Sequence, residues 1–243
     1  MTVRLIGIGG FGIRIAEQMS SEDIEGVSLA VIDTDRDEVE NSEIDNALKI
    51  GEESPLGGGT NGWVTLGAKA AAEAFMEIGK MVSDVDIVLI VAGLGGGTGT
   101  GAAPVVAKMA HEKGVHVCAA VKNPFTFEGA QKAEYSLEGI KSLKDTTDNL
   151  CLYDIKFVDG KSDSLHHPES FGVDFSKTDI KEISKNLTMD QLFDLIYSNI
   201  LEYVKSLAEC SSLESLKSSG NTFTGYTAPQ NANTVYSVLG GLY

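Results

Sequence analysis

Two glycine-rich stretches have the composition and the position of phosphate-binding loops. The first, Gly-Ile-Gly-Gly-Phe-Gly at residues 7–12, lies between an apolar run and a stretch with helical spacing. The second, Gly-Gly-Gly-Thr-Gly-Thr-Gly at residues 95–101, follows the most apolar run of the chain and precedes an alanine-rich segment. Glycines let a backbone approach phosphate closely, and the free amides of a helix N-terminus attract anions. We therefore expect both loops to hold phosphate groups.

The second loop is the more informative of the two. No simple turn requires so many glycines, and Thr98 and Thr100 add hydroxyl donors. No Gly-Lys-Ser/Thr follows, so the loop lacks the lysine that neutralises phosphate charge in a P-loop. A metal ion such as Mg²⁺ is then favoured beside the phosphates.

The first loop leaves another function open. Asp33 ends an apolar run about 20 residues after this loop, as does the ribose-binding acid of NAD and FAD sites. A dinucleotide-dependent oxidoreductase is therefore an alternative. A tight turn without any ligand would produce the same glycines.

The elements that must position these loops alternate along the chain. Apolar strands are predicted over 3–8, 27–32, 86–92, 115–121 and 150–153. Helices are predicted over 13–19, 64–81, 102–113 and 130–143. This order indicates an α/β fold, a Rossmann-like parallel sheet with helices on both faces.

One principal domain is expected over residues 1–210. It ends in a long central helix over 188–209, which Thr188 is placed to cap, and contains an irregular insertion over 154–185. Residues 211–243 are rich in Ser, Gly, Thr and Asn and predict a short, partly flexible C-terminal segment.

The bulk composition excludes several kinds of partner. A net charge of −16 disfavours nucleic acid and anionic membranes, which attract clustered Lys and Arg. The 3 cysteines are widely spaced and form no CxxC pair, which argues against a disulfide framework or a zinc site. No signal peptide pattern opens the chain, and its apolar runs are too short to span a bilayer. We expect a cytoplasmic protein without direct membrane insertion.

Four segments together resemble one family. Residues 95–101 with the following Ala-Ala-Pro-Val-Val are similar to the tubulin signature loop in its FtsZ form. Residues 7–12 resemble the first glycine loop of FtsZ, Leu-Gly-Gly-Gly-Thr-Asn at 56–61 its terminal-phosphate loop, and Pro-Phe-Thr-Phe-Glu-Gly at 124–129 its PFxFEG segment. Order and spacing agree from about residue 3 to residue 153. The chain is identified as similar to the FtsZ/tubulin superfamily.

The resemblance implies a GTPase domain that binds GTP or GDP with Mg²⁺. It also implies a homo-oligomer or an FtsZ-like filament partner, and a role in the cytoskeleton or in cell division. Carried over position by position, the nucleotide-binding residues are Gly9, Gly10, Phe11, Arg14, Asp33, Gly58, Gly59, Thr60, Gly95, Gly96, Gly97, Thr98, Gly99, Thr100, Glu128, Lys132 and Tyr197.

Several of these positions depart from the FtsZ pattern. Lys132 replaces an arginine and loses its bidentate hydrogen bonding, Arg14 replaces a small amide residue, and Phe11 replaces a glycine. Tyr197 occupies the central-helix position that reads guanine in the family, where it would stack on the base. The sequence therefore predicts phosphate binding more directly than it predicts a guanine base.

The catalytic residues of the family are not found. FtsZ offers an acidic loop, placed after its central helix, to the nucleotide of the next subunit, whereas here no Asp follows Asp194. FtsZ also has a second, activating domain that this sequence does not show. We therefore expect a GTP-binding protein with weak or absent self-activated hydrolysis, with no catalytic residue assigned. A nucleotide-free structural or regulatory module for a full-length homologue is a further alternative.

Overall fold

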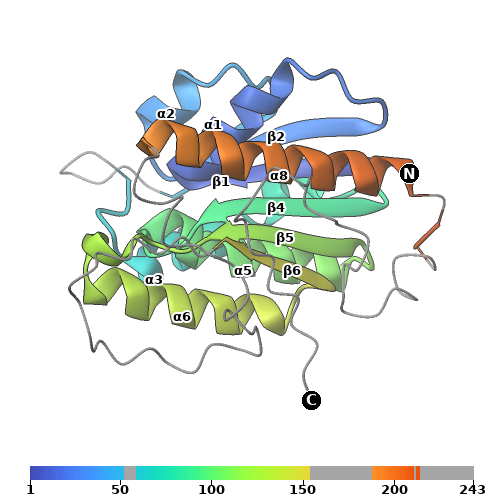
Figure 1. Ribbon diagram of the computed structural model, residues 1–243. Helices are drawn as coiled ribbons and strands as arrows, with labels where there is room; N and C mark the ends of the chain where they lie inside the picture. Colours follow the sequence, from blue (N-terminus) through green and yellow to red (C-terminus); the bar gives the residue numbers. More distant parts are fainter. Residues whose placement is uncertain (52–58, 154–187, 211, 214–243) are drawn as a thin grey trace.

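The computed structural model describes residues 1–51, 59–153, 188–210 and 212–213, in which six strands form one sheet in the order β3-β2-β1-β4-β5-β6 (Figure 1). Every neighbouring pair is parallel. Helices cover both faces, so the predicted α/β architecture is confirmed. The strand order reverses between β1 and β4, and this switch point is where parallel sheets bind ligands.

The strands coincide with the apolar runs because a parallel sheet covered by helices is buried on both faces. In the central strand β4, all residues from Ile87 to Ala92 are fully buried. Only the short edge strand β3 had no counterpart among the predictions. The strands are β1 (Val3–Ile8), β2 (Val27–Asp33), β3 (Ala47–Lys49), β4 (Ile87–Gly93), β5 (His116–Lys122) and β6 (Asn149–Tyr153).

The helices differ from the predictions in several places. Helix α2 (Arg36–Glu40) had no predicted counterpart, and α1 (Gly9–Ser20) begins four residues earlier than the helix expected over 13–19. The single helix expected over 64–81 is broken at Ala74, whose backbone (φ −85°, ψ 27°) leaves the helical region. The helix expected over 102–113 begins earlier, at Gly97, so that residues 97–101 of the second loop lie in its first turns. The helices are α1 (Gly9–Ser20), α2 (Arg36–Glu40), α3 (Val64–Glu73), α4 (Phe75–Met81), α5 (Gly97–Glu112), α6 (Ala130–Lys144) and α8 (Met189–Glu209), with a 3-10 turn η1 (Thr126–Glu128).

One face of the sheet is covered by α1 and α8, and α8 runs across it as the central helix expected over 188–209 (Figure 1). Ile196, Ile200 and Val204 recur at helical spacing and are fully buried against this face. Thr188 caps the helix as predicted, since its hydroxyl accepts the amide hydrogen of Gln191. The Gln191 side chain accepts in return from the Thr188 amide.

The other face is covered by α3, α4, α5 and α6. Helices α3 and α5 pack so closely that their backbones are in contact, with no room for side chains between them. A Cβ atom placed on Gly67 would meet the carbonyl of Gly97, and one placed on Gly101 would meet the carbonyl of Val64, each closer than 3.0 Å. The predicted insertion at 154–185 and the segment 214–243 lie outside the described residues.

Candidate nucleotide-binding site

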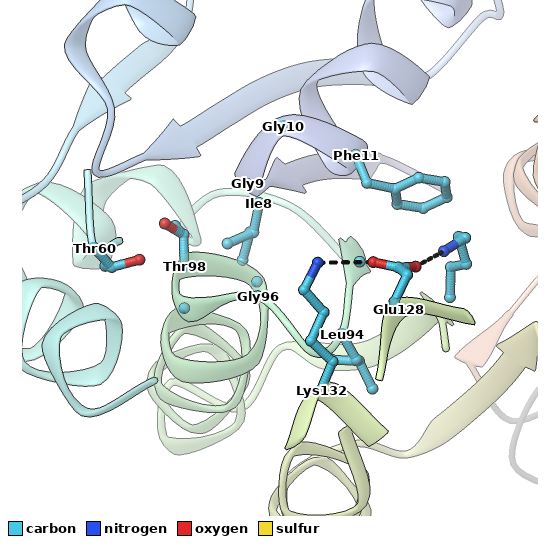
Figure 2. Close-up of a pocket in the computed structure, with 14 residues that line it drawn as sticks. Ile8, Gly9, Gly10, Phe11, Thr60, Leu94, Gly96, Thr98, Glu128 and Lys132 are labelled. Atoms are coloured by element: carbon cyan, nitrogen blue, oxygen red, sulfur yellow. Dashed lines mark hydrogen bonds and ion pairs between the residues drawn. The ribbon is translucent and has the colours of Figure 1, made fainter. Parts of the chain in front are cut away.

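A cavity of about 280 Å³ lies at the switch point, at the carboxyl ends of β1, β4 and β5. Four segments meet there: the β1–α1 junction, Thr60 ahead of α3, the β4–α5 junction, and the stretch from the end of β5 into α6 (Figure 2). The lining residues are Ile8, Gly9, Gly10, Phe11, Thr60, Gly93, Leu94, Gly96, Gly97, Thr98, Gly99, Lys122, Glu128 and Lys132.

The second glycine loop opens α5 directly into this cavity. Gly96 is the N-cap, with extended backbone (φ −88°, ψ 170°) and no side chain on the helix end. The amide of Gly95 donates to Thr100 Oγ1 at 2.8 Å, which closes the loop onto the first turn of the helix. The amides of the first helical turn therefore have no intrahelical acceptor, and the positive end of the helix dipole faces the cavity.

The first glycine loop brings a second helix N-terminus to the same cavity. Helix α1 begins at Gly9, whose φ of +76° lies in the region that favours glycine, and no acidic residue occupies its first turn. A Cβ on Gly9 would lie 3.3 Å from the amide nitrogen of Gly99, so the two loops are in contact. Two helix N-termini thus point at one space, which suits a polyanion such as a chain of phosphates.

Packing explains several glycines that sequence reasoning attributed to phosphate binding. A Cβ on Gly97 would lie 2.7 Å from Thr60 Cβ and 2.9 Å from the carbonyl oxygen of Trp63. Gly99 and Gly101 face the backbones of Gly93 and Val64 with equally little room. A Cβ on Gly96, in contrast, would meet nothing within 4 Å. Three glycines of the loop are therefore required by the packing of the fold, and their number alone does not identify a phosphate site.

The opposite end of the cavity carries its charged groups. Lys132 Nζ lies 2.8 Å from Glu128 Oε2, one helical turn away, and Lys122 Nζ lies 3.7 Å from Glu128 Oε1 (Figure 2). Burial raises the pKa of Glu128, but hydrogen bonds from Lys132 and from the Phe125 amide, with the charge of Lys122, outweigh it and leave that pKa below its ordinary value. Glu128 is therefore a firmly ionised carboxylate between two cations.

Asp33 does not line the cavity. It is 4% exposed and its Oδ1 accepts the amide hydrogens of Thr34 at 2.6 Å and Asp35 at 3.2 Å. Burial raises the pKa of Asp33 above its ordinary value, although these hydrogen bonds act against the rise. The Thr34 hydroxyl lies 2.7 Å from that of Thr98, so Asp33 supports a residue of the glycine loop.

Tyr197 also lies away from the cavity. Its hydroxyl donates toward Gln18 O and Glu22 Oε1, both at 3.1 Å, at the far end of α1. Two residues in the first turns of α8, Asp190 and Phe193, contact Arg14. The Arg14 guanidinium lies 3.7 Å from the Asp190 carboxylate and 4.7 Å from the centroid of the Phe193 ring.

Phe193 connects this pair to the lining residues, since its ring lies 6.1 Å from that of Phe11 and 6.3 Å from that of Phe125. Gly59, Gly95 and Thr100 flank the lining residues without joining them, and Gly58 lies outside the described residues. No group of three His, Cys, Asp or Glu suited to hold a metal ion occurs among the described residues.

Sequence reasoning missed Lys122, which lies 7% exposed at the carboxyl end of β5. A charged residue that closes an apolar strand is the signal that would have found it, because ligand contacts gather at these strand ends. Asp190 and Phe193, which contact Arg14 from the first turns of α8, were also not among the predicted residues.

Comparison with known proteins agrees with this geometry. The sequence model of the tubulin/FtsZ family, GTPase domain, matches residues 2–158. The chain belongs to this family. It is 42% identical over 146 residues to the cell division protein FtsZ of Aquifex aeolicus, a match that covers 60% of this chain and 40% of that protein. It thus spans about two fifths of the length of such relatives.

Solved structures share the fold. The empty FtsZ dimer of M. jannaschii is 28% identical, with a TM-score of 0.71, over 89% of this chain and 59% of that chain. The GTPγS-bound protofilament of CetZ2 from Haloferax volcanii, at 23% identity and a TM-score of 0.67, covers 89% and 62% of the two chains and is similar in fold. The family match includes both glycine loops, so the oxidoreductase alternative is not supported. Among the described helices, none combines the length and apolarity needed to cross a membrane.

Proposed function

We propose that this chain binds GTP or GDP in the cavity, with Mg²⁺ beside the phosphates. The observation that carries the proposal is the convergence of the α1 and α5 N-termini on one cavity, in a chain of the tubulin/FtsZ family. Amides and helix dipoles supply the anion site, and a bound cation supplies the charge that a P-loop lysine would otherwise provide.

The lining residues divide into a phosphate end and a sugar end. Residues 9–10 and 96–99, with Thr60, would hold the phosphates through backbone amides and hydroxyl groups. Glu128 and Lys132 lie at the other end, where a carboxylate accepts from sugar hydroxyls and a lysine reaches toward the first phosphate. Asp33, buried beneath Thr98, would shape the phosphate end without touching the ligand.

Aromatic rings and one ion pair favour a guanine base. Phe11 and Phe193 form an apolar wall beyond the sugar end, and Arg14 pairs with Asp190 beside it. Guanine presents acceptors at O6 and N7, which match arginine, and donors at N1 and N2, which match a carboxylate. Adenine carries an amino group at the position of O6, where it would oppose Arg14.

Hydrolysis by the isolated chain is proposed to be slow. Glu128 is the carboxylate among the described lining residues, and its lowered pKa and its pairing with two lysines make it a poor base for activating water. The chain would bind nucleotide more readily than it cleaves it. By analogy with FtsZ and CetZ, we propose that it self-assembles or joins the filament of a longer homologue, in a cytoskeletal or cell-division role.

The test is to release bound nucleotide from the purified chain with acid, identify it by chromatography, and titrate GTP, GDP, ATP and NAD with and without Mg²⁺. We expect guanine nucleotides to bind at least about tenfold more tightly than ATP, the discrimination one good base contact provides. Sedimentation with GTP tests assembly. Equal affinity for ATP would refute the guanine assignment, and binding of none of these ligands would refute the proposed function.

A further inference from the structure

Lys122 is a buried cation beside the cavity. It ends β5 on the same face of the sheet as Cys118 and Ala120, the face covered by α1 and α8. Its Nζ donates to the carbonyl of Asn123 at 2.9 Å and lies 3.8 Å from the centroid of the Phe125 ring. The side chain is held in place on the wall of the cavity.

The hydrogen bonds of Lys122 are incomplete. An ammonium group has three donors, and burial makes an unfilled donor costly. Among the described residues the Lys122 ammonium donates to the Asn123 carbonyl and lies 3.7 Å from Glu128 Oε1, which also accepts the Phe125 amide at 2.8 Å. Even with Glu128 counted as a partner, one of its three donors is left for a group inside the cavity.

The charges around Lys122 are also unbalanced. Glu128 is one carboxylate shared by Lys122 and Lys132, so these three groups carry a net charge of +1. The side chain of Lys132 is about half exposed, at 48%, and is free to follow a ligand, whereas that of Lys122 is 9% exposed and fixed. A fixed donor beside a fixed acceptor matches hydroxyl groups, each of which both donates and accepts.

We propose that Lys122 and Glu128 jointly bind the ribose hydroxyls of the nucleotide, and that Lys122 makes the site selective for ribonucleotides over their deoxy forms. Lys122 donates to a hydroxyl oxygen whose hydrogen is accepted by Glu128. The inference rests on the proposed function, because the phosphate end must hold the nucleotide for the sugar to lie here. Sites built to bond a hydroxyl strongly reject analogues that lack it, since their buried polar groups lose their partners.

The first test compares GDP with 2′,3′-dideoxy-GDP by calorimetry. The wild type should prefer GDP at least about tenfold, as expected for hydrogen bonds to charged groups. Lys122→Met, which keeps the side-chain length, should reduce this preference to less than about threefold, because it weakens the binding of GDP and leaves that of 2′,3′-dideoxy-GDP unchanged. Lys141→Met, an exposed lysine of α6 outside the cavity, is the matched control and should behave as the wild type.

Two other results of these titrations would separate the ribose assignment from the proposed function. If Lys122→Met keeps the full preference, or weakens both nucleotides equally, the ribose assignment is overturned while the proposed function stands. If the wild type binds neither nucleotide, the proposed function fails, and the inference fails with it.

A second test uses the wild-type chain, so that it does not depend on how the variant folds. Periodate-oxidised GDP carries aldehydes in place of the ribose diol, and the neutral amine of a neighbouring lysine adds to one, loses water and forms an imine. Borohydride then reduces the imine to a stable secondary amine. Burial lowers the pKa of Lys122, which favours the reactive neutral form. Peptide mass spectrometry should find the adduct on Lys122, and excess GDP should prevent it; an adduct on Lys132 with none on Lys122 would overturn the proposal.

Discussion

Two adjacent glycines of the second loop should respond to the same substitution in opposite ways. In Gly97→Ala the new methyl group would lie 2.7 Å from Thr60 Cβ, where real contacts need at least 3.0 Å, and 2.9 Å from a carbonyl oxygen of Trp63. Overpacking of this kind costs about 1–3 kcal/mol of unfolding free energy. The better helix propensity of alanine returns about 0.5–1 kcal/mol, so a net loss of stability is expected.

In Gly96→Ala the methyl group meets nothing within 4 Å, and the backbone has φ −88°, which alanine adopts easily. Unfolding in urea should change by less than about 1 kcal/mol, because the small loss at an N-cap opposes the lower entropy of the unfolded chain. The methyl group would occupy part of the cavity, however. Loss of a single charge-assisted hydrogen bond there would weaken the binding of GDP at least about tenfold.

Urea unfolding and calorimetric titration of GDP on both variants measure the two effects separately. Gly79→Ala, inside α4, is the control, since its Cβ would lie 3.5 Å from Cε of Lys113 at the end of α5, an ordinary contact distance. It should be as stable as the wild type or more so, with unchanged GDP affinity. Wild-type GDP affinity in Gly96→Ala, or wild-type stability in Gly97→Ala, would refute the division of the loop into a ligand-facing and a fold-facing glycine.

Three further outcomes follow from the contacts around the site. Because the pKa of Glu128 is lowered in the folded state, its charge stabilises the fold above the ordinary pKa of 4.5, and this contribution is lost as the pH falls through the lower folded value. The free energy of unfolding of Glu128→Gln, measured in urea from pH 7 to pH 3, should therefore fall less steeply with acid than that of the wild type. Tyr197→Phe should cost about 0.5–1.5 kcal/mol of stability and leave GDP affinity within about twofold, and a large affinity loss would return Tyr197 to the base site. Thr98→Val removes the buried 2.7 Å bond to Thr34, and should lower both the melting temperature and GDP affinity.

The sheet was predictable because each of its long strands is marked by residues that are neighbours in the sequence. Each long strand is an apolar run of five to seven residues. The cap of α8 likewise depends on two residues close in sequence, Thr188 and Gln191. The edge strand β3 was missed because three half-buried residues produce no pattern. The break between α3 and α4 was missed because Ala74 is a strong helix former, so tertiary packing decides it.

The site was predictable to the extent that each loop carries its own signal. Strand, glycines and helix follow one another at both junctions, and both loops line the cavity. The packing role of Gly97 was not predictable, since its neighbours Thr60 and Trp63 come from a distant segment. The predicted register selected Tyr197, whereas the α8 residue that pairs with Arg14 is Asp190. The helix follows a long segment without periodicity, so the sequence alone did not show which turn of α8 faces α1.

The close approach of α3 to the start of α5 places a natural fluorophore, Trp63, beside the second glycine loop. Trp63 is the only tryptophan of the chain, the residue is 62% exposed, and its carbonyl oxygen lies against Gly97. A ligand that shifts the glycine loop must also shift the segment that carries the indole ring, and tryptophan emission responds to such changes in solvent contact. Rapid mixing with nucleotide would therefore give association and release rates from native fluorescence, with no dye attached.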